Sequence, residues 1–288
     1  MSRSAELGEQ KSIAVTGGTL NYRERGSGPP ILFVHGLLVN GDLWRKVVPE
    51  LHSDHRCITP DLPLGSHEEP FDSAAELTPL TLARMLRELI EGLGLEDLTV
   101  VANDTGGAIT QMLIAENPDL VARLVLTPCD VGKNFLPLRF RYLQWIAKVP
   151  ASLGLVAQSV RIGFIRNGPI AFGPLAKHGI DDAAAASYTE PPRRNAGVRR
   201  DVAKVLNGIS TRDSLAALDR LPAFRGRSLI VWSDDGRVFP RKDAEALAQK
   251  LPGARIEIID DSYAFVPEDQ PQRLAGLIRE FATEAQPG

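Results

Sequence analysis

The chain has 288 residues, with 33 basic against 36 acidic side chains, 43% hydrophobic residues and two cysteines. A formal net charge of −3 gives no general attraction to a polyanion, so the composition does not favour nucleic-acid binding. Two cysteines cannot form a disulfide framework, and no residues have the spacing of a metal site. The apolar runs are far shorter than the roughly 20 residues that span a bilayer, so we expect no membrane partner.

The N-terminal segment and the chain length bear on location and domain number. Residues 1–10 are polar and lack the apolar middle of a signal peptide, which predicts a cytoplasmic protein. The length fits two folding units, but it equally fits one large α/β core with an insertion.

Short apolar runs alternate with segments of helical spacing, a pattern typical of a mostly parallel sheet covered by helices. A hairpin through Gly17 and Gly18 comes first. The pattern predicts eight strands, at 12–15, 19–25, 31–34, 56–59, 98–102, 123–127, 228–232 and 255–259. It predicts core helices at 79–92, 105–117, 242–251 and 271–283.

The alternation stops between residues 132 and 212, where helical segments with aromatic residues surround a break at Pro191 and Pro192. We therefore predict a helical cap, 132–212, inserted into a core made of 1–131 and 213–288. The cap carries 13 Lys or Arg against four Asp or Glu, a net charge of +9. This charge is either a solvated cationic face or a means of drawing an anionic ligand toward the cleft.

The sharpest local signal is residues 100–107, Val-Val-Ala-Asn-Asp-Thr-Gly-Gly, an apolar strand followed at once by a helix. Such a turn raises its central side chain, Asp104, above the sheet edge, while Gly106 and Gly107 leave room where helix and strand approach. A raised carboxylate can attack an sp³ carbon and form an ester with the enzyme. The alternative is that Asp104 only caps the helix.

A second signal is the pair His35-Gly36 at the end of a buried strand. The amide that follows, of Leu37, is expected to point at the same pocket as the amide of Thr105 after the elbow. These two N–H groups predict an oxyanion hole.

With the segments 26–30 (Gly-Ser-Gly-Pro-Pro), 60–63 (Pro-Asp-Leu-Pro) and 266–271 (Val-Pro-Glu-Asp-Gln-Pro), these motifs resemble the α/β-hydrolase fold superfamily. Within it, the chain is similar to the haloalkane dehalogenase and epoxide hydrolase branch. The resemblance implies an α/β-hydrolase fold, a cleft between core and cap, and Asp104 in the nucleophile position.

The sequence departs from the family pattern at the other triad positions. Ala264 stands where the family has its catalytic His, and Gly236 stands at the usual acid position. Asp234 and Asp235 adjoin that position, while Asp130 lies where a subset of the family carries its acid. Without a base to activate water, hydrolysis of an ester on Asp104 loses about 10²–10⁴-fold in rate. The family's halide-binding Trp and Asn are replaced by Thr105 and Leu37, which disfavours dehalogenation.

Other residues are candidates for the missing functions. His67 lies on a loop at the carboxyl side of the sheet and is the preferred substitute base, with His35 as a second candidate. Tyr142 and Tyr188 are cap tyrosines that can protonate a leaving oxygen in an epoxide hydrolase, although such aromatics commonly serve packing. Further expected substrate contacts are Asn103, Trp145, Ala264 and Phe265.

Three functions remain open. The first is a hydrolase-like enzyme for a small or medium organic substrate, with Asp104 as nucleophile or general base, no cofactor, and an anionic substrate allowed. The second is a lyase, isomerase or cyclase that uses Asp104 for proton transfer without attack by water. The third is a ligand-binding protein with a decayed triad. A homodimer is also left open.

Overall fold

The computed structural model describes residues 3–284, so Met1 and Ser2 of the polar N-terminal segment lie outside the described residues. The sheet begins with an antiparallel hairpin of β1 (Glu9–Val15) and β2 (Gly18–Arg25). Gly17 and Gly18 both have positive φ angles, which explains the glycines at this turn. The predicted hairpin is confirmed.

The sheet has eight strands in the order β1-β2-β4-β3-β5-β6-β7-β8. After the antiparallel pairing of β2 with β4, all neighbours are parallel. The strands are β3 (Pro30–Val34), β4 (Arg56–Pro60), β5 (Thr99–Asp104), β6 (Arg123–Cys129), β7 (Arg227–Ser233) and β8 (Arg255–Ile259). Every residue of β5 and β6 is buried, as expected for central parallel strands with helices on both faces.

The helices of the core are α1 (Val48–Leu51), α2 (Pro79–Gly92), α3 (Thr105–Glu116), α9 (Thr211–Arg220), α10 (Arg241–Lys250), α11 (Val266–Asp269) and α12 (Pro271–Thr283). Helix α2 begins at a capping box formed by Thr78 and Thr81, and buries Leu82, Leu86 and Leu89 on one face. Helix α3 is buried along most of its length between α2, α9 and the sheet. This burial fixes its first turn, which follows Asp104 directly.

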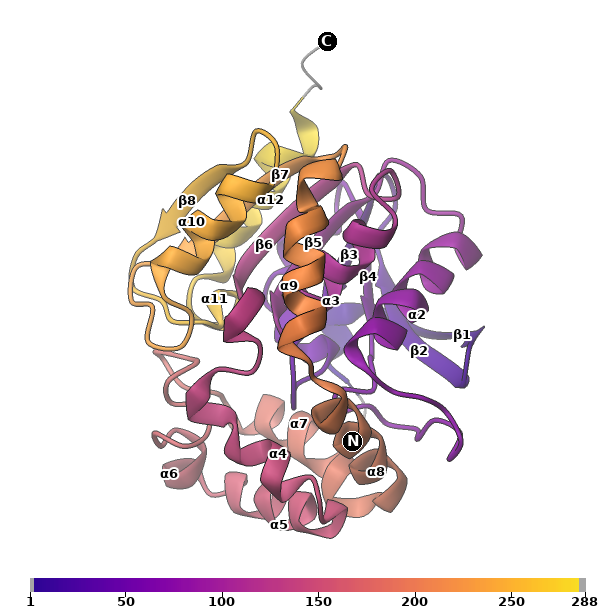
Figure 1. Cartoon of the computed structure of the whole chain (residues 1–288), viewed down its shortest axis with the longest axis vertical. Coiled ribbons are helices and arrows are strands. Elements are labelled where there is room, and N and C mark those ends of the chain that lie inside the picture. Colours follow the sequence, from indigo (N-terminus) through magenta and orange to yellow (C-terminus); the bar gives the residue numbers. More distant parts are fainter. Residues whose placement is uncertain (1–2, 285–288) are drawn as a thin grey trace.

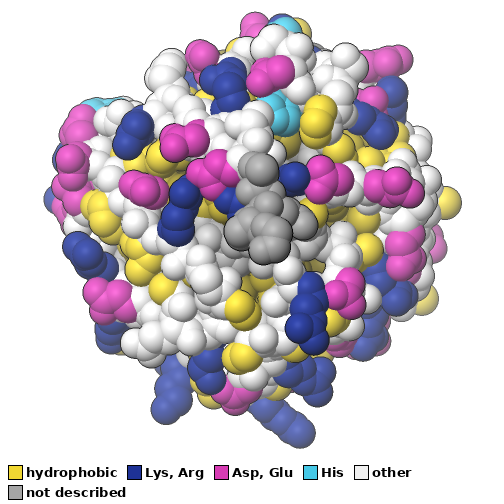
Figure 2. All heavy atoms as spheres, turned by 90° about the horizontal axis from the view of Figure 1, so that it is seen from above, with side chains coloured by type: hydrophobic (Ala, Val, Ile, Leu, Met, Phe, Trp, Pro, Cys, Tyr) yellow, Lys and Arg dark blue, Asp and Glu magenta, His cyan; other side chains and the backbone are white. Residues whose placement is uncertain are grey.

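Residues 132–212 contain helices and no strand, and we keep the name cap for this segment. Its helices are α4 (Tyr142–Ile146), α5 (Pro150–Val160), α6 (Gly163–Arg166), α7 (Asp182–Arg194) and α8 (Ala196–Gly208), and the short 3₁₀ turns η3 (Gly132–Asn134) and η4 (Leu138–Phe140) precede them. They lie together across one end of the sheet, the lower end in Figure 1. The opposite end, seen in Figure 2, shows Lys and Arg side chains interspersed with Asp and Glu.

The prediction of a break at Pro191 and Pro192 is wrong, because both prolines lie inside α7. A proline has no N–H to donate, so these two residues free the helical carbonyls of Ser187 and Tyr188. The freed carbonyls find partners outside the helix. The carbonyl of Ser187 accepts from Arg3 and Asn40, and that of Tyr188 accepts from the Ser66 hydroxyl at 2.8 Å. The carbonyls that the two prolines leave free therefore connect the cap to three segments of the core.

We expect Ser66→Ala to lower the free energy of unfolding by about 1–3 kcal/mol, because it leaves a buried carbonyl of Tyr188 without a donor. The additional change Pro192→Ala supplies an N–H to that carbonyl within the helix, so the double variant should regain part of the loss. Urea unfolding of both variants measures this, with Ser73→Ala, at an exposed position of the same loop, as the matched control. Equal stability of Ser66→Ala and Ser73→Ala would contradict the attachment.

No helix within residues 3–284 has both the length and the apolar composition that a membrane crossing requires.

Candidate active site

Asp104 is the last residue of β5 and the N-cap of α3, with φ 55° and ψ −135°. This positive φ is strained for an aspartate, and such strain is held by surrounding structure. Glycines make the turn possible. A Cβ at Gly106 would lie 2.3 Å from the carbonyl oxygen of His35, and one at Gly36 would lie 2.4 Å from the Cβ of Asp104. The structure thus shows the sharp turn that the sequence predicts.

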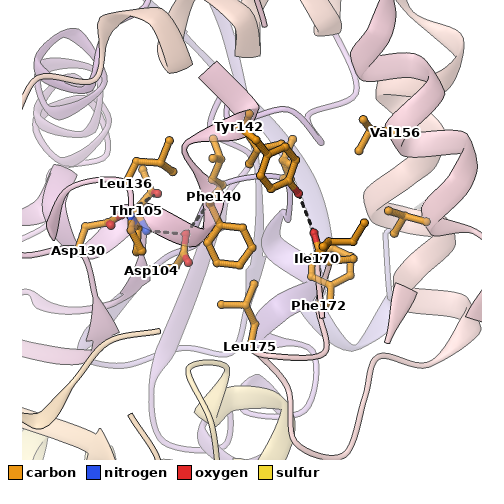
Figure 3. A pocket seen from close by; sticks show the side chains of 16 residues that line it. Asp104, Thr105, Asp130, Leu136, Phe140, Tyr142, Val156, Ile170, Phe172 and Leu175 are labelled. Carbon is orange, nitrogen blue, oxygen red and sulfur yellow. Dashed lines mark hydrogen bonds between the residues drawn. The ribbon is translucent and has the colours of Figure 1, made fainter. Parts of the chain in front are cut away.

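The carboxylate of Asp104 has two distinct oxygens. Oδ1 accepts from the amide of Leu37 at 3.0 Å and from that of Thr105 at 2.7 Å. The two amides expected to converge do so, and they hold an oxygen of Asp104 itself (Figure 3). In the part of the chain that is described, nothing donates to Oδ2. Asp104 therefore caps helix α3 through Oδ1 and, within residues 3–284, still has Oδ2 free of hydrogen bonds.

Burial raises the pKa of Asp104, while the hydrogen bonds from the Thr105 and Leu37 amides oppose that rise. The side chain is only 8% exposed, and it lines a pocket. A carboxylate that is poorly solvated and held by two fixed donors has one free oxygen and a single orientation. Both properties favour attack on a substrate carbon.

Asp130 follows β6 and is connected to the elbow through Thr105. The Thr105 hydroxyl donates to Asp130 Oδ2 at 3.0 Å, whereas Asp130 Oδ1 is buried without a partner. Burial and the nearby charge of Asp104 raise the pKa of Asp130 well above its usual range. Asp130 therefore holds a proton readily, and it lines the same pocket as Asp104.

A buried carboxyl with a raised pKa binds its proton more tightly in the folded than in the unfolded chain. Its cost to stability is absent below the unfolded pKa of about 4 and grows as the pH rises from there toward the folded pKa. We expect Asp130→Asn to raise the free energy of unfolding at neutral pH, with the gain disappearing near pH ~4. Urea unfolding across pH checks this. A difference that is independent of pH, or one that Asp234→Asn at an exposed position reproduces, would contradict it.

The pocket at Asp104, which we call the main pocket, contains about 610 Å³ of empty space, a figure that includes space open to solvent. Apart from Asp104, Thr105, Asp130 and the Tyr142 ring, its walls are apolar. They come from core and cap, at Leu37, Leu38, Leu136, Pro137, Phe140, Leu143, Val156, Val160, Ile170, Ala171, Phe172 and Leu175. The lining has two carboxyl groups and no Lys, Arg or His. This lining does not favour the anionic substrate that the cationic cap left open.

Of the expected cap contacts, Tyr142 lines the pocket and Trp145 does not. The Tyr142 hydroxyl donates to the carbonyl of Ile170 at 2.7 Å, so its proton is already engaged (Figure 3). Burial raises the pKa of Tyr142, which keeps the phenol neutral. Trp145 is 78% exposed on α4, so the structure does not bring it to the pocket.

Neither candidate for the missing base lies in the pocket lining. The hydrogen bonds of His35 assign its proton to Nδ1, which donates to Gly36 O at 2.9 Å, while Nε2 accepts from the Leu62 amide. Burial lowers the pKa of His35 to about 4, so the ring is neutral and both nitrogens are engaged. His67 Nε2 lies 3.3 Å from Asp201 on α8, where it joins a core loop to the cap. These contacts give both rings structural positions instead of the predicted catalytic ones.

Tyr188 is buried on α7, outside the pocket lining. Its hydroxyl faces Glu268 Oε1 at 3.4 Å, and Glu268 also pairs with Arg45 and Lys46. Burial and the charge of Glu268 raise the pKa of Tyr188 well above its usual range. The tyrosine belongs to a polar cluster that joins cap and core, and it also lines a smaller neighbouring pocket that shares Leu38 and Phe172 with the pocket of Asp104.

Asn103, Ala264 and Phe265 also lie outside the pocket lining, contrary to expectation. The Asn103 amide donates to the carbonyls of Pro128 and Ala264 and to the Thr127 hydroxyl, which ties the loop at Ala264 to the elbow. The Phe265 ring stacks at an angle on Phe172, with 6.1 Å between centroids. These residues position the loop that borders the cap-side wall of the pocket, although none of the three is part of the lining.

Sequence reasoning missed the apolar wall that the cap supplies, at Leu136, Phe140, Phe172 and Leu175. The backbone amide of Phe265 donates to the Leu175 carbonyl at 2.6 Å, which seats this part of the cap on the loop at Ala264. Leu175 and Asp104 line the same pocket (Figure 3). No motif marks these residues, because apolar side chains in the cap look alike whether they face the cavity or the cap interior.

The chain is similar to several known proteins of the same fold. The chain is 29% identical over 270 residues to haloalkane dehalogenase 2 of Mycobacterium bovis, covering 91% of each protein. It is 24% identical to a cis-3-alkyl-4-alkyloxetan-2-one decarboxylase of Shewanella oneidensis, covering 95% of this chain and 88% of that protein. The crystal structure of a haloalkane dehalogenase from Agrobacterium tumefaciens superposes with a TM-score of 0.79 at 20% identity, covering 97% and 99% of the chains.

The structural likeness at 20% identity shows the fold alone, and the family follows from the sequence match. A family model described as the alpha/beta hydrolase fold matches residues 29–271, which include the elbow at Asp104 and the loop at Ala264. The chain belongs to the alpha/beta hydrolase fold family.

Proposed function

We propose that the protein is an enzyme in which Asp104 attacks an electrophilic carbon of an uncharged, apolar substrate. The bond forms between Asp104 Oδ2 and that carbon, giving an ester on the enzyme. The electron pair of the broken bond leaves with a halide, or stays on the oxygen of an opened ring. The observation that carries the proposal is the occupation of both amides, of Leu37 and Thr105, by Asp104 Oδ1.

Because Asp104 Oδ1 fills both amides, a role of Asp104 as nucleophile is favoured over a role as general base. A substrate carbonyl oxygen cannot use the two amides while Asp104 Oδ1 fills them, so they do not serve a substrate oxyanion. In an ester formed through Oδ2, Oδ1 becomes the ester carbonyl oxygen and stays bound to both amides. Negative charge that develops on Oδ1 when water attacks the ester is then stabilised without rearrangement.

Asp130 is the proposed proton donor for a ring oxygen. Its raised pKa favours the protonated form, and Thr105 fixes its position beside the elbow. After giving up its proton, Asp130 is the remaining carboxylate in the pocket lining that can take a proton from water. Because the lining contains no His, we propose that the ester forms faster than it hydrolyses.

The apolar walls and two carboxyl groups support an uncharged substrate, such as a medium-chain epoxide, a halogenated alkane or an oxetan-2-one. The second and third of these classes are also named in two relatives, a haloalkane dehalogenase and an oxetan-2-one decarboxylase.

The oxetan-2-one decarboxylase also supports a second candidate, a lyase reaction. Splitting an oxetan-2-one breaks one ring C–O and one ring C–C bond and gives an alkene and CO₂, with no water consumed. Such a reaction does not need the water-activating base that the pocket lining lacks. In this alternative Asp104 and Asp130 polarise and orient the ring without a lasting ester.

Intact-protein mass spectrometry after mixing with a medium-chain epoxide, alkyl bromide or cis-3,4-dialkyl-oxetan-2-one tests the proposal. An epoxide or lactone ester adds the whole reagent mass, and a bromide ester adds the reagent mass less HBr. Peptide mapping should place the addition on Asp104. Release of an alkene from the lactone without an adduct would favour the lyase. Thermal stabilisation by all three reagents with neither adduct nor product would overturn both in favour of a binding protein.

A further inference from the structure

The outer surface of the cap is unusually apolar. Seven large apolar side chains between residues 138 and 170 are more than half exposed, at Leu138, Trp145, Val149, Leu155, Ile162, Phe164 and Ile170. They belong to η4, α4, α5, α6, the turns between them and the turn after α6, at the lower end of the molecule in Figure 1. We call these seven residues the apolar cap face.

Helix α5 shows that this surface lacks a partner within the chain. Its inner side buries Leu153, Ala157 and Val160, while its outer side exposes Ala151 and Leu155. The helix contains no charged residue. The outer side also exposes the neutral amide of Gln158, so this uncharged surface is suited to the boundary between an apolar layer and water.

The charge around the face has one sign. Residues 131–180 contain no Asp or Glu, and the same stretch carries exposed cations at Arg139, Arg141, Lys148 and Arg161, between the apolar residues in the sequence. Within residues 3–284 none of these four forms an ion pair, although Arg139 donates to the carbonyl of Pro169. The opposite end of the molecule mixes both signs of charge (Figure 2). Exposed apolar area alone suits several kinds of partner, but its combination in one segment with exposed cations that form no ion pair among the described residues matches an anionic lipid surface.

We propose that the apolar cap face docks on anionic lipid bilayers, with Trp145, Leu155 and Phe164 at the interface and the four cations at the lipid headgroups. Trp145 suits this position because its ring is apolar and carries one N–H. Peripheral docking of this kind is distinct from spanning the membrane, for which the composition gives no support. It revises the expectation of no membrane partner.

The face is continuous with the pocket. Ile170 is 66% exposed and also lines the cavity, and Tyr142 lines it one helical turn from Trp145. Docking therefore brings the cavity close to apolar compounds dissolved in the bilayer. This step, the delivery of substrate from the bilayer, rests on the function proposed above, whereas the docking itself does not.

A second copy of the chain is the main competing occupant. Two copies joined through this face by a two-fold axis would place the cations of one against the cations of the other. Residues 131–180 offer no carboxylate to offset that repulsion, and Glu190 on α7, which lies near Arg161, is already paired with Arg193 and Arg194. An anionic bilayer meets both the apolar and the cationic parts of the face.

The chain carries its own reporter for the test. Trp44 and Trp232 are fully buried, so Trp145 is the tryptophan whose fluorescence responds to the surroundings of the cap. We expect a blue shift and less acrylamide quenching with vesicles of phosphatidylcholine and phosphatidylglycerol, but not with phosphatidylcholine alone. Added salt should weaken the effect, since it screens the cations. Equal binding to neutral vesicles, or none to either kind, would overturn the proposal.

Vesicle co-sedimentation of two variants measures how much the cations and the apolar side chains each contribute to binding. The double change Arg141→Ser and Lys148→Ser should weaken binding about 10- to 30-fold, at roughly 1 kcal/mol per cation. Leu155→Ser with Phe164→Ser should also weaken it, and both changes are at exposed positions that the fold tolerates. The matched control is Arg84→Ser with Arg241→Ser, on α2 and α10.

Two further measurements distinguish lipid docking from dimerisation and from the proposed ester chemistry. A concentration-dependent blue shift without vesicles, together with dimers in size-exclusion chromatography, would assign the face to a second copy and overturn the proposal. Ester formation with a water-soluble short-chain epoxide should be unchanged in both face variants. Loss of docking with intact ester formation therefore removes this inference alone, and docking without any ester removes the proposed function alone.

Discussion

Asp104→Asn should abolish ester formation, with a loss of about 10⁴-fold or more in the rate of labelling, because an amide is a far weaker nucleophile than a carboxylate. The substitution keeps the shape of the side chain, and the amide oxygen can still accept from the Leu37 and Thr105 N–H groups. The pocket and the turn should therefore persist. Time-resolved intact mass spectrometry with the epoxide and the bromide measures the rate.

The matched control for this change is Asp234→Asn. Asp234 lies on the loop after β7, near the position where the family usually has its acid, and it is exposed. It should react at the native rate. Labelling of Asp104→Asn at the native rate would show that another group attacks the reagent, and the proposed mechanism would fail.

Ala264→His should raise the turnover of the ester by about 10²–10⁴-fold, because it returns a base that can activate water. The carbonyl of Ala264 is bonded to Asn103, the neighbour of Asp104, so the backbone at residue 264 is held against the elbow. Asp130, which already lines the pocket, is the acid available to orient the new ring. Product release over many turnovers, with less accumulated ester, is the measured result.

Ala264→Asn is the control, since it adds polar bulk at the same position without a base. A similar gain in both variants would point to altered packing against Phe172 and Leu175 instead of base catalysis. No gain in Ala264→His, with the ester still accumulating, would contradict the placement of residue 264. Adding Gly236→Asp is not expected to help, because a Cβ there would lie 2.7 Å from the carbonyl oxygen of Phe239.

The regular core could be predicted closely from local patterns. Helices 79–92 and 271–283 and strand 255–259 have the bounds that periodicity, caps and prolines indicate. These features act over a few residues, so they can be interpreted without knowing the fold. The error at Pro191 and Pro192 has the opposite cause. The donors that make the prolines tolerable, on Arg3, Asn40 and Ser66, come from segments more than 120 residues away in the chain.

In the candidate site, too, some residues could be predicted from local motifs and others could not. Asp104 and the amides of Leu37 and Thr105 follow from two short motifs, because a sharp turn with glycines at fixed offsets leaves little freedom to the backbone. The histidines could not be placed. Whether an imidazole faces a cavity depends on which distant groups bind its nitrogens, and here these are the Leu62 amide for His35 and Asp201 for His67.

The sequence by itself determined the eight strands in chain order, the turn at Asp104 and the absence of a His at position 264, since each of these is a local property of the chain. The tertiary structure decided that Asp104 Oδ1 fills its own pair of amides, that Asp130 joins the pocket through Thr105, and that Trp145 faces outward. These outcomes depend on how the cap packs on the core. That packing sums many weak, non-directional apolar contacts between distant segments, which no local pattern records.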